Sequence, residues 1–134
     1  MCRSIFIIDD YPINLRIAEM IIRNQGVFEK VSTYLDASEA FEHLTTHMNN
    51  EAHLPDVILL DIHMPLMDGW MFLDRFEDIM PYFAKRIEIF IASSSMDYYD
   101  RQRIKRYPSV KGAFQKPLQS EMLHEIAARL GAVG

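Results

Sequence analysis

Apolar and polar positions divide the chain into five strand-like segments that alternate with five helix-like segments. Two of the strand-like segments, residues 5–8 and 57–60, are short apolar runs, which are typical of strands buried on both faces of a parallel sheet. Within residues 27–35, Val31, Thr33 and Leu35 alternate with polar neighbours, which predicts a strand with one apolar face. The fourth strand is expected at residues 87–92 and a short fifth strand at residues 112–115.

The helix-like segments carry apolar residues three and four positions apart, as expected when one face of a helix is buried. They cover residues 12–25, 37–48, 69–80, 98–106 and 120–130. Pro12 suits the first turn of a helix, and Pro81 ends the third segment. Asp36 and Glu39 have the spacing of a capping box. The residues expected on the buried helix faces are Leu15, Ala18, Ile21, Ile22, Ala40, Phe41, Leu44, Met48, Phe72, Leu73, Phe76, Ile79, Tyr98, Tyr99, Ile104, Leu123, Ile126, Ala127 and Leu130.

The alternation of strand and helix predicts an α/β fold, a doubly wound parallel sheet with right-handed crossovers. The expected strand order is 2-1-3-4-5, the order of the flavodoxin-like (βα)5 fold. In that order the first and third strands flank a crevice at the carboxyl ends of the strands. Functional side chains are therefore expected at these strand ends.

Polar and charged residues stand directly after four of the predicted strands. They are Asp9 and Asp10 after residues 5–8, Asp61 after residues 57–60, Ser93 after residues 87–92, and Lys116 after residues 112–115. Because parallel strands end at one edge of a sheet, these groups are expected around one pocket. Beyond Asp61, Pro65 prevents the strand from continuing, and Asp68 with Gly69 predicts a turn whose aspartate also suits a helix N-cap.

The chemistry of this set indicates a metal-assisted phosphoryl site. Three carboxylates within a few ångströms repel one another, and a hard divalent cation with oxygen ligands relieves that repulsion. Mg²⁺ is expected, with Mn²⁺ as an alternative. Asp61 is the expected nucleophile, because carboxylates form acyl phosphates, and Lys116 and Ser93 are expected to bind the phosphoryl oxygens. The expected metal ligands are Asp9, Asp10, Asp61 and the backbone carbonyl of His63.

Composition narrows the remaining possibilities. The 134 residues are expected to form one domain, residues 1–134, and the net charge of −5 argues against direct binding of nucleic acid. No apolar stretch approaches the roughly 18 residues of a membrane span. The single cysteine, Cys2, rules out an intrachain disulfide and fits a reducing compartment, so a cytoplasmic location is expected.

Taken in order, the chain resembles the receiver domain of two-component response regulators. The residues that carry the resemblance are Asp9 and Asp10, Asp61 with Met64, Pro65, Asp68 and Gly69, then Ser93, and finally Lys116 with Pro117. The resemblance extends over essentially the whole chain and implies a stand-alone phosphoacceptor module rather than an enzyme with a small-molecule substrate.

The resemblance also implies partners. Asp61 would accept a phosphoryl group from a phosphohistidine on a sensor histidine kinase or a histidine phosphotransfer protein. Ser93 would then move toward the phosphoryl group, and the face made by the fourth helix, fifth strand and fifth helix would engage a downstream protein. His63 and Ser95 would line the approach of hydrolytic water, unless they are ordinary loop residues.

The chain departs from the receiver pattern in two places. Many receivers carry Tyr or Phe three residues before the lysine, whereas this chain has Ala113 there and Phe114 beside it. Because neighbouring residues of a strand face opposite sides of a sheet, Phe114 is not expected to replace the missing aromatic. The segment around residues 49–53 is several residues longer than expected and is interpreted as a surface insertion.

Two other functions stay open at this point. A Mg²⁺-dependent phosphohydrolase that forms an aspartyl phosphate is disfavoured, because haloacid dehalogenase-like enzymes place a second aspartate where this chain has His63. A degenerate receiver that binds partners without phosphorylation is disfavoured by the complete set of site residues, although Ala113 keeps it open. His43 and His47 have the spacing of a helical zinc site, but the sequence offers no evident third ligand.

Overall fold

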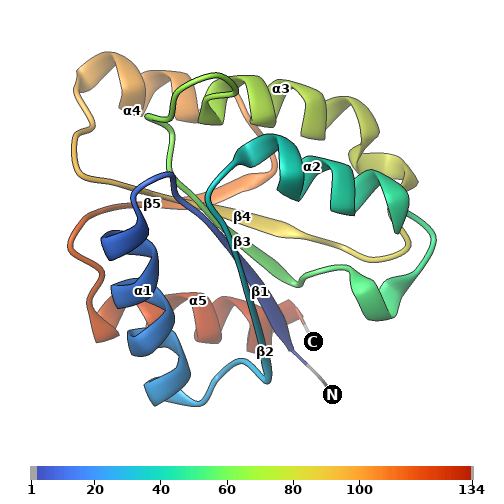
Figure 1. The fold of residues 1–134 in the computed structure, drawn as a ribbon, viewed down its shortest axis with the longest axis horizontal. Helices are drawn as coiled ribbons and strands as arrows, with labels where there is room; N and C mark the ends of the chain where they lie inside the picture. Colours follow the sequence, from blue (N-terminus) through green and yellow to red (C-terminus); the bar gives the residue numbers. More distant parts are fainter. Residues whose placement is uncertain (1–2, 134) are drawn as a thin grey trace.

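The computed structural model describes residues 3–133, with side chains as far as residue 130, so Cys2 lies outside the described part of the chain. Its five strands form one parallel sheet in the predicted order β2-β1-β3-β4-β5 (Figure 1). The strands are β1 (Ser4–Ile8), β2 (Lys30–Tyr34), β3 (Val57–Leu60), β4 (Glu88–Ser93) and β5 (Val110–Gln115).

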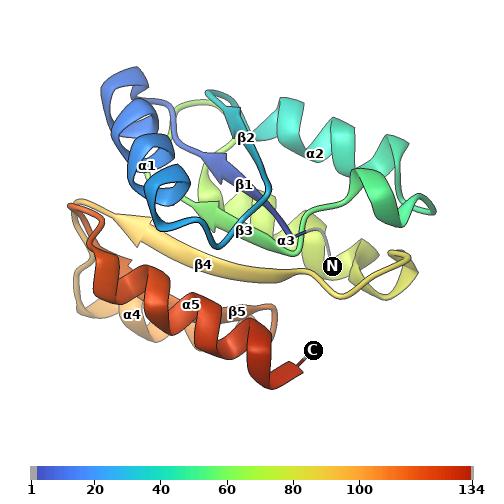
Figure 2. The same ribbon diagram turned by 90° about the horizontal axis from the view of Figure 1, so that it is seen from below.

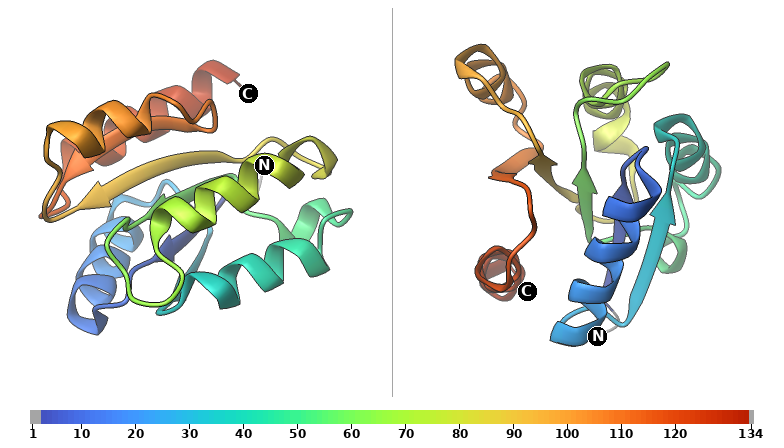
Figure 3. Two further views of the ribbon diagram at one scale, coloured as in Figure 1. Left: turned by 90° about the horizontal axis from the view of Figure 1, so that it is seen from above. Right: turned by 60° about the vertical axis from the view of Figure 1, so that its left-hand side comes forward.

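Helices cover both faces of the sheet. In the views from below and from above, α1 and α5 lie on one face and α2, α3 and α4 lie on the other (Figures 2 and 3). The helices are α1 (Pro12–Gln25), α2 (Ala37–Thr46), α3 (Gly69–Ile79), α4 (Tyr98–Ile104) and α5 (Ser120–Val133). Two 3₁₀ turns, η1 (Glu51–His53) and η2 (Met80–Tyr82), precede β3 and follow α3. The predicted doubly wound α/β fold is confirmed.

The three central strands divide the core into two layers, because alternate side chains of a strand face opposite sides. The layer under α1 and α5 contains Ile5, Ile7, Val57, Leu59, Phe90 and Ala92. The layer under α2, α3 and α4 contains Phe6, Ile8, Ile58, Leu60, Ile89 and Ile91. Burial on both faces explains why β3 is an unbroken apolar run and why β1 and β4 are polar only at their ends, at Ser4, Glu88 and Ser93.

The edge strand β2 differs from the prediction. Val31 packs against the layer under α1 and α5, but Thr33 and Leu35 are exposed. Leu35 lies beyond the end of the strand at Tyr34, and Tyr34 packs instead against the opposite layer. An edge strand has a neighbour on one side only, so its alternation is a weaker guide to burial.

Aspartates cap three of the helices. Asp36 is the N-cap of α2 at the predicted place and accepts hydrogen bonds from the backbone N–H and hydroxyl of Ser38, at 2.9 and 2.8 Å, but Glu39 does not complete the predicted capping box. The capping box forms instead at the start of α4, between Asp97 and Asp100. The predicted cap of α3 is confirmed, since Asp68 accepts a hydrogen bond from the N–H of Met71 at 2.9 Å.

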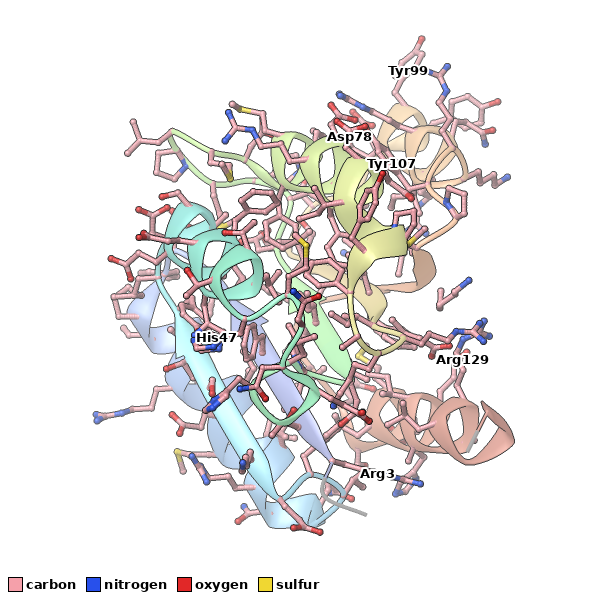
Figure 4. All side chains as sticks on the ribbon, turned by 90° about the vertical axis from the view of Figure 1, so that its right-hand side faces the viewer. Arg3, His47, Asp78, Tyr99, Tyr107 and Arg129 are labelled. Atoms are coloured by element: carbon pink, nitrogen blue, oxygen red, sulfur yellow. The ribbon has the colours of Figure 1, made fainter. Side chains whose placement is uncertain are left out.

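The inner face of α4 was only partly predicted. Ile104 packs on the core, whereas Tyr98 and Tyr99 are 68% and 79% exposed, and Tyr99 projects from the outer end of α4 (Figure 4). Both tyrosines belong to the first turn of a helix of seven residues, which presents little of its surface to the core. Tyr107, just beyond α4, supplies the aromatic contact with the core instead.

Segment lengths depart slightly from the prediction. β5 begins at Val110 and α5 continues to Val133, whereas α2 ends at Thr46 and the expected loop before β3 contains the turn η1. Pro81 lies in η2, directly after the end of α3. Within residues 3–133, the structure has no helix with both the length and the apolar character that crossing a membrane requires.

Gly69 is required by a close backbone approach rather than by the predicted turn. It is the first residue of α3, its backbone lies outside the left-handed region, and its N–H donates to the carbonyl of Ile62 at 3.1 Å. A Cβ atom at this position would lie 2.5 Å from the Cα of Ile62 and 2.9 Å from the carbonyl oxygen of Asp61. Any side chain here must therefore displace the loop that follows β3.

Gly69→Ala is expected to lower the free energy of unfolding by about 3 kcal/mol or more, because both contacts are with backbone atoms that cannot turn away. Urea denaturation measures this. Gly26→Ala is the matched control: Gly26 has φ 69° at the end of α1, but a Cβ atom there would have no neighbour within 4 Å, so strain alone should cost about 1 kcal/mol. Equal losses in the two variants would contradict the close-approach argument.

Candidate acidic site at the carboxyl edge of the sheet

Neighbouring strand ends bring the three predicted carboxylates together. β1 and β3 are paired so that Ile8 lies opposite Leu60, and Asp9 and Asp61 therefore leave the sheet side by side. The N–H of Asp61 donates to the carbonyl of Ile8 at 3.0 Å, which extends the sheet hydrogen bonds into the site. One carboxylate oxygen from each of Asp9, Asp10 and Asp61 lies within 4.8 Å of the others. This convergence was predicted from the sequence.

Lys116 brings a positive charge from the end of β5. Its N–H donates to the carbonyl of Ser93 at 2.8 Å, which fixes the chain where β4 and β5 end. Its Nζ donates to a carboxylate oxygen of Asp9 and lies 3.4 Å from Oδ2 of Asp61. The ammonium group therefore joins two of the three carboxylates, as the sequence predicted for their shared pocket.

Burial sets the electrostatics of Asp61. The residue is 8% exposed, and loss of hydration raises the pKa of its carboxyl group above the usual value of 3.8. A hydrogen bond from the N–H of His63, at 3.1 Å to Oδ1, and the charge of Lys116 both act to lower this pKa, while the charge of Asp9 raises it further. Desolvation is the largest effect, so burial disfavours the ionised form of the Asp61 carboxyl group.

Ser93 lies at the predicted strand end but turns its hydroxyl toward its own loop. The side chain is fully buried, its Oγ donates to the carbonyl of Ser95 at 3.1 Å, and it accepts from the N–H of Ser95 at 3.3 Å. The hydroxyl thus lies at the end of β4, the strand next to β3, and is engaged with the backbone of the loop between β4 and α4.

His63 makes a contact that the sequence did not predict. Its Nε2 lies 2.9 Å from the carbonyl oxygen of Ser95 and 3.5 Å from Oδ2 of Asp100 in the first turn of α4. A carbonyl oxygen accepts hydrogen bonds only, so Nε2 must carry the hydrogen. His63 and Ser93 therefore donate to the same carbonyl, and the loop after β3 is tied to the loop before α4. Asp97 and Asp100 have the spacing of a capping box, which places the Asp100 carboxylate at the start of α4, and this is the one sequence signal that bears on the contact. The role of the His63 backbone carbonyl as a metal ligand stays a prediction.

The sheet register confirms that Phe114 cannot take the place of Ala113. Ala113 pairs with Ile91 and packs against the layer under α2, α3 and α4. Phe114 packs on the other layer, where its ring stacks on Phe90 with centroids 6.0 Å apart. The face where many receivers carry an aromatic side chain thus carries a methyl group in this chain.

Comparisons with known proteins agree with this geometry. A sequence model described as "Response regulator receiver domain" matches residues 5–128. The chain is 27% identical over 128 residues to "Response regulator Rre1" of Synechocystis sp., which covers 95% of this chain and 51% of that protein. It is 33% identical over 79 residues to a protein-glutamate methylesterase/protein-glutamine glutaminase of Methanococcus maripaludis, which covers 59% of this chain and 19% of that protein. The chain therefore spans about half, or less, of these two curated relatives.

Solved structures show the same fold. A two-component response regulator from Cytophaga hutchinsonii superposes with a TM-score of 0.86 at 24% identity, covering 96% of each chain. A response regulator receiver protein from Dyadobacter fermentans superposes with a TM-score of 0.82 at 29% identity, covering 96% of this chain and 97% of that one. With the family match over nearly the whole chain, these similarities establish that the chain belongs to the receiver domain family of two-component response regulators.

Proposed function

We propose that this receiver domain is a phosphoacceptor in a two-component or phosphorelay system, and that Asp61 accepts the phosphoryl group in a Mg²⁺-dependent reaction. One observation carries the proposal. A desolvated carboxylate, Asp61, lies between two further carboxylates and one ammonium group, each supplied by the end of a strand or the residue after it. This arrangement has a nucleophile, a place for a divalent cation and a cation for the phosphoryl oxygens.

The donor set fits a hard divalent cation. Carboxylate oxygens of Asp9, Asp10 and Asp61 lie within 4.8 Å of one another, and Asp10 is partly exposed, so the set is open to water. These oxygens suit Mg²⁺, and Mn²⁺ takes similar ligands. A bound Mg²⁺ supplies positive charge that offsets the repulsion among the carboxylates and an arriving phosphoryl group.

The residues of the chain divide the work of transfer. The N–H of His63 holds Oδ1 of Asp61 and so fixes the rotation of the carboxylate before the reaction. A carboxylate oxygen then forms a bond to phosphorus while the bond from phosphorus to the donor's imidazole nitrogen breaks. Lys116, 3.4 Å from Oδ2, is placed to pair with a phosphoryl oxygen. Pre-set geometry and charge neutralisation account for catalysis of this kind.

The route from the site to a partner passes through Ser93. If its hydroxyl turns to the phosphoryl group, the carbonyl of Ser95 loses one of its two hydrogen bonds and keeps the one from His63. The loop between β4 and α4 then has a new set of contacts, which shifts the face formed by α4, β5 and α5 between two states. The exposed Tyr98 and Tyr99 are available on α4 for a downstream protein.

In this proposal a sensor histidine kinase or a histidine phosphotransfer protein supplies the phosphoryl group. The domain catalyses its own phosphorylation and dephosphorylation and turns over no small-molecule substrate. The two alternatives make different forecasts. A phosphohydrolase would turn over a generic phosphate ester, and a degenerate receiver would acquire no phosphoryl group at all.

The fluorescence of Trp70 offers a direct test. This single tryptophan is next to Gly69, its ring stacks on Tyr107 with centroids 6.0 Å apart, and the guanidinium of Arg103 on α4 lies 4.4 Å from it. We expect Mg²⁺, and then beryllofluoride with Mg²⁺, to change the emission of the wild-type protein. The Asp61→Asn variant should respond to neither, because it lacks the acceptor carboxylate.

A covalent assay completes this test. Phosphoramidate carries its phosphoryl group on nitrogen, as phosphohistidine does, and should add one phosphoryl group to the wild type, visible by mass spectrometry, but none to Asp61→Asn. An unmodified wild type that still binds Mg²⁺ would support the degenerate receiver. Steady release of p-nitrophenol from p-nitrophenyl phosphate would support the phosphohydrolase.

The burial of Asp61 also predicts a pH-dependent stability. Because its pKa is raised in the folded protein, the contribution of Asp61 to stability is most favourable below pH 3.8, falls as the pH rises through the raised pKa, and is constant above it. Asp61→Asn should therefore raise the free energy of unfolding at pH 7 without metal, and the gain should shrink on acidification.

Denaturant unfolding at several pH values measures this effect. The control is Asp78→Asn, which removes a carboxylate from the exposed side of α3 and should change stability by less than about 0.5 kcal/mol. A destabilised Asp61→Asn protein at pH 7 would show that the ionised carboxylate is favourably placed even without a cation.

A further inference from the structure

Three of the five histidines gather at the surface where α2 ends and η1 precedes β3. His47, the residue that follows α2 (Figure 4), has its ring centroid 4.5 Å from that of His43 and 4.7 Å from that of His53. The sequence offered the first two histidines with no third partner. The structure supplies the third from η1, within the segment interpreted as a surface insertion.

The tautomer of His43 is fixed by the chain itself. Its Nε2 lies 2.9 Å from the backbone carbonyl oxygen of His53, and because a carbonyl only accepts, Nε2 must carry the hydrogen. The lone pair of the ring is then on Nδ1. A histidine that binds a metal through one nitrogen usually donates its other N–H to a carbonyl or carboxylate, and this hydrogen bond is of that kind.

The surroundings of His43 hold its ring in place. The ring packs edge-on against Phe6 of β1, with centroids 5.3 Å apart, and lies 6.4 Å from the ring of Tyr34. His53, by contrast, is exposed, and His47 is half-buried, so both rings can turn about their side-chain bonds. A surface hollow of about 480 Å³, lined in part by His47 and Glu51, adjoins them and gives room for water.

We propose that His43, His47 and His53 form a binding site for a divalent transition-metal ion of the zinc class, with water as a fourth ligand. Zn–N bonds of about 2.0–2.1 Å in tetrahedral geometry place ligand nitrogens about 3.4 Å apart. The carboxylate oxygens of the three aspartates already converge, whereas the histidines reach this geometry only when the rings of His47 and His53 rotate about their own side-chain bonds while His43 stays in place.

The ligand type separates this site from the acidic one. Imidazole nitrogens favour Zn²⁺, Ni²⁺ and Cu²⁺, whereas carboxylate oxygens favour Mg²⁺. An ion held by the three rings would join the end of α2 to η1, and so fix the chain segment that enters β3. The inference is independent of the phosphoacceptor function, because it involves none of the residues of the acidic group.

Zinc titration of the full chain tests the proposal. In the presence of excess Mg²⁺, isothermal titration calorimetry is expected to find one Zn²⁺ ion per chain, and thermal unfolding is expected to move to higher temperature with added Zn²⁺. His47→Ala and His53→Ala should each weaken the affinity at least tenfold and abolish most of the thermal shift. Co²⁺ should give visible absorption bands typical of tetrahedral coordination, and these should be lost in both variants.

Two variants serve as controls. His124→Ala removes an exposed histidine on α5 and should leave Zn²⁺ affinity unchanged, as should Asp61→Asn, which alters the acidic group. Circular dichroism checks that each histidine variant is folded, and the exposed position of His53 makes its variant the safer one. The proposal is overturned if the wild type binds no Zn²⁺, or if Asp61→Asn removes the binding that His47→Ala and His53→Ala retain.

Discussion

The burial of a carboxylate beside two others, at the edge where β1 and β3 end, is the constraint on which the site depends. The pairing of β1 with β3 brings Asp9 and Asp61 out of the sheet side by side, and Asp10 follows directly in the chain. Lys116 offsets part of the repulsion among the carboxylates by joining Asp9 and Asp61. The pKa of Asp61 nevertheless stays raised because its carboxyl group has lost hydration, and the charge of Lys116 lowers this pKa more than the charge of Asp9 raises it. A site with unbalanced negative charge at the end of buried strands is suited to a cation and a phosphoryl group, which together restore the balance.

The same edge shows why the loop after β3 is so tightly specified. Gly69 approaches the backbone of Asp61 and Ile62 so closely that a side chain has no room, and its N–H closes the loop onto the carbonyl of Ile62. Asp68 then caps α3, and Trp70 follows in the interface with α4. The position of the Asp61 carboxylate and the start of α3 are therefore fixed by one set of backbone contacts. A displacement of the backbone at Asp61 must also displace the start of α3 at Gly69, because the packed backbone has few alternative arrangements.

Sequence patterns predicted the features that are determined by residues close together in the sequence. Apolar runs predicted the central strands, and the residues that follow them predicted the acidic group and Lys116, because parallel strands must end at one edge. Contacts between distant segments could not be predicted in this way. The buried Glu88 lies 3.4 Å from Nε of Arg129 on α5 (Figure 4), and His63 reaches Ser95, but neither partner has a periodic or motif-like signal. The exposed edge of β2 was misjudged for a related reason, since alternation in a single strand does not reveal where the neighbouring helix stops.

The replacement of an aromatic residue by Ala113 changes where coupling between the site and α4 can run. A methyl group on that face of β5 cannot follow the movement of a hydroxyl at Ser93, and Phe114 is held on the opposite face by its stack with Phe90. The contacts that do join the acidic edge to α4 come from the loop after β3 and the start of α3, and not from β5. His63 reaches the loop before α4 through Ser95 and Asp100, while the Trp70 ring lies between α3 and Arg103 of α4. Because both contacts begin at or near the loop that carries Asp61, they connect that loop to α4 without an aromatic side chain on β5.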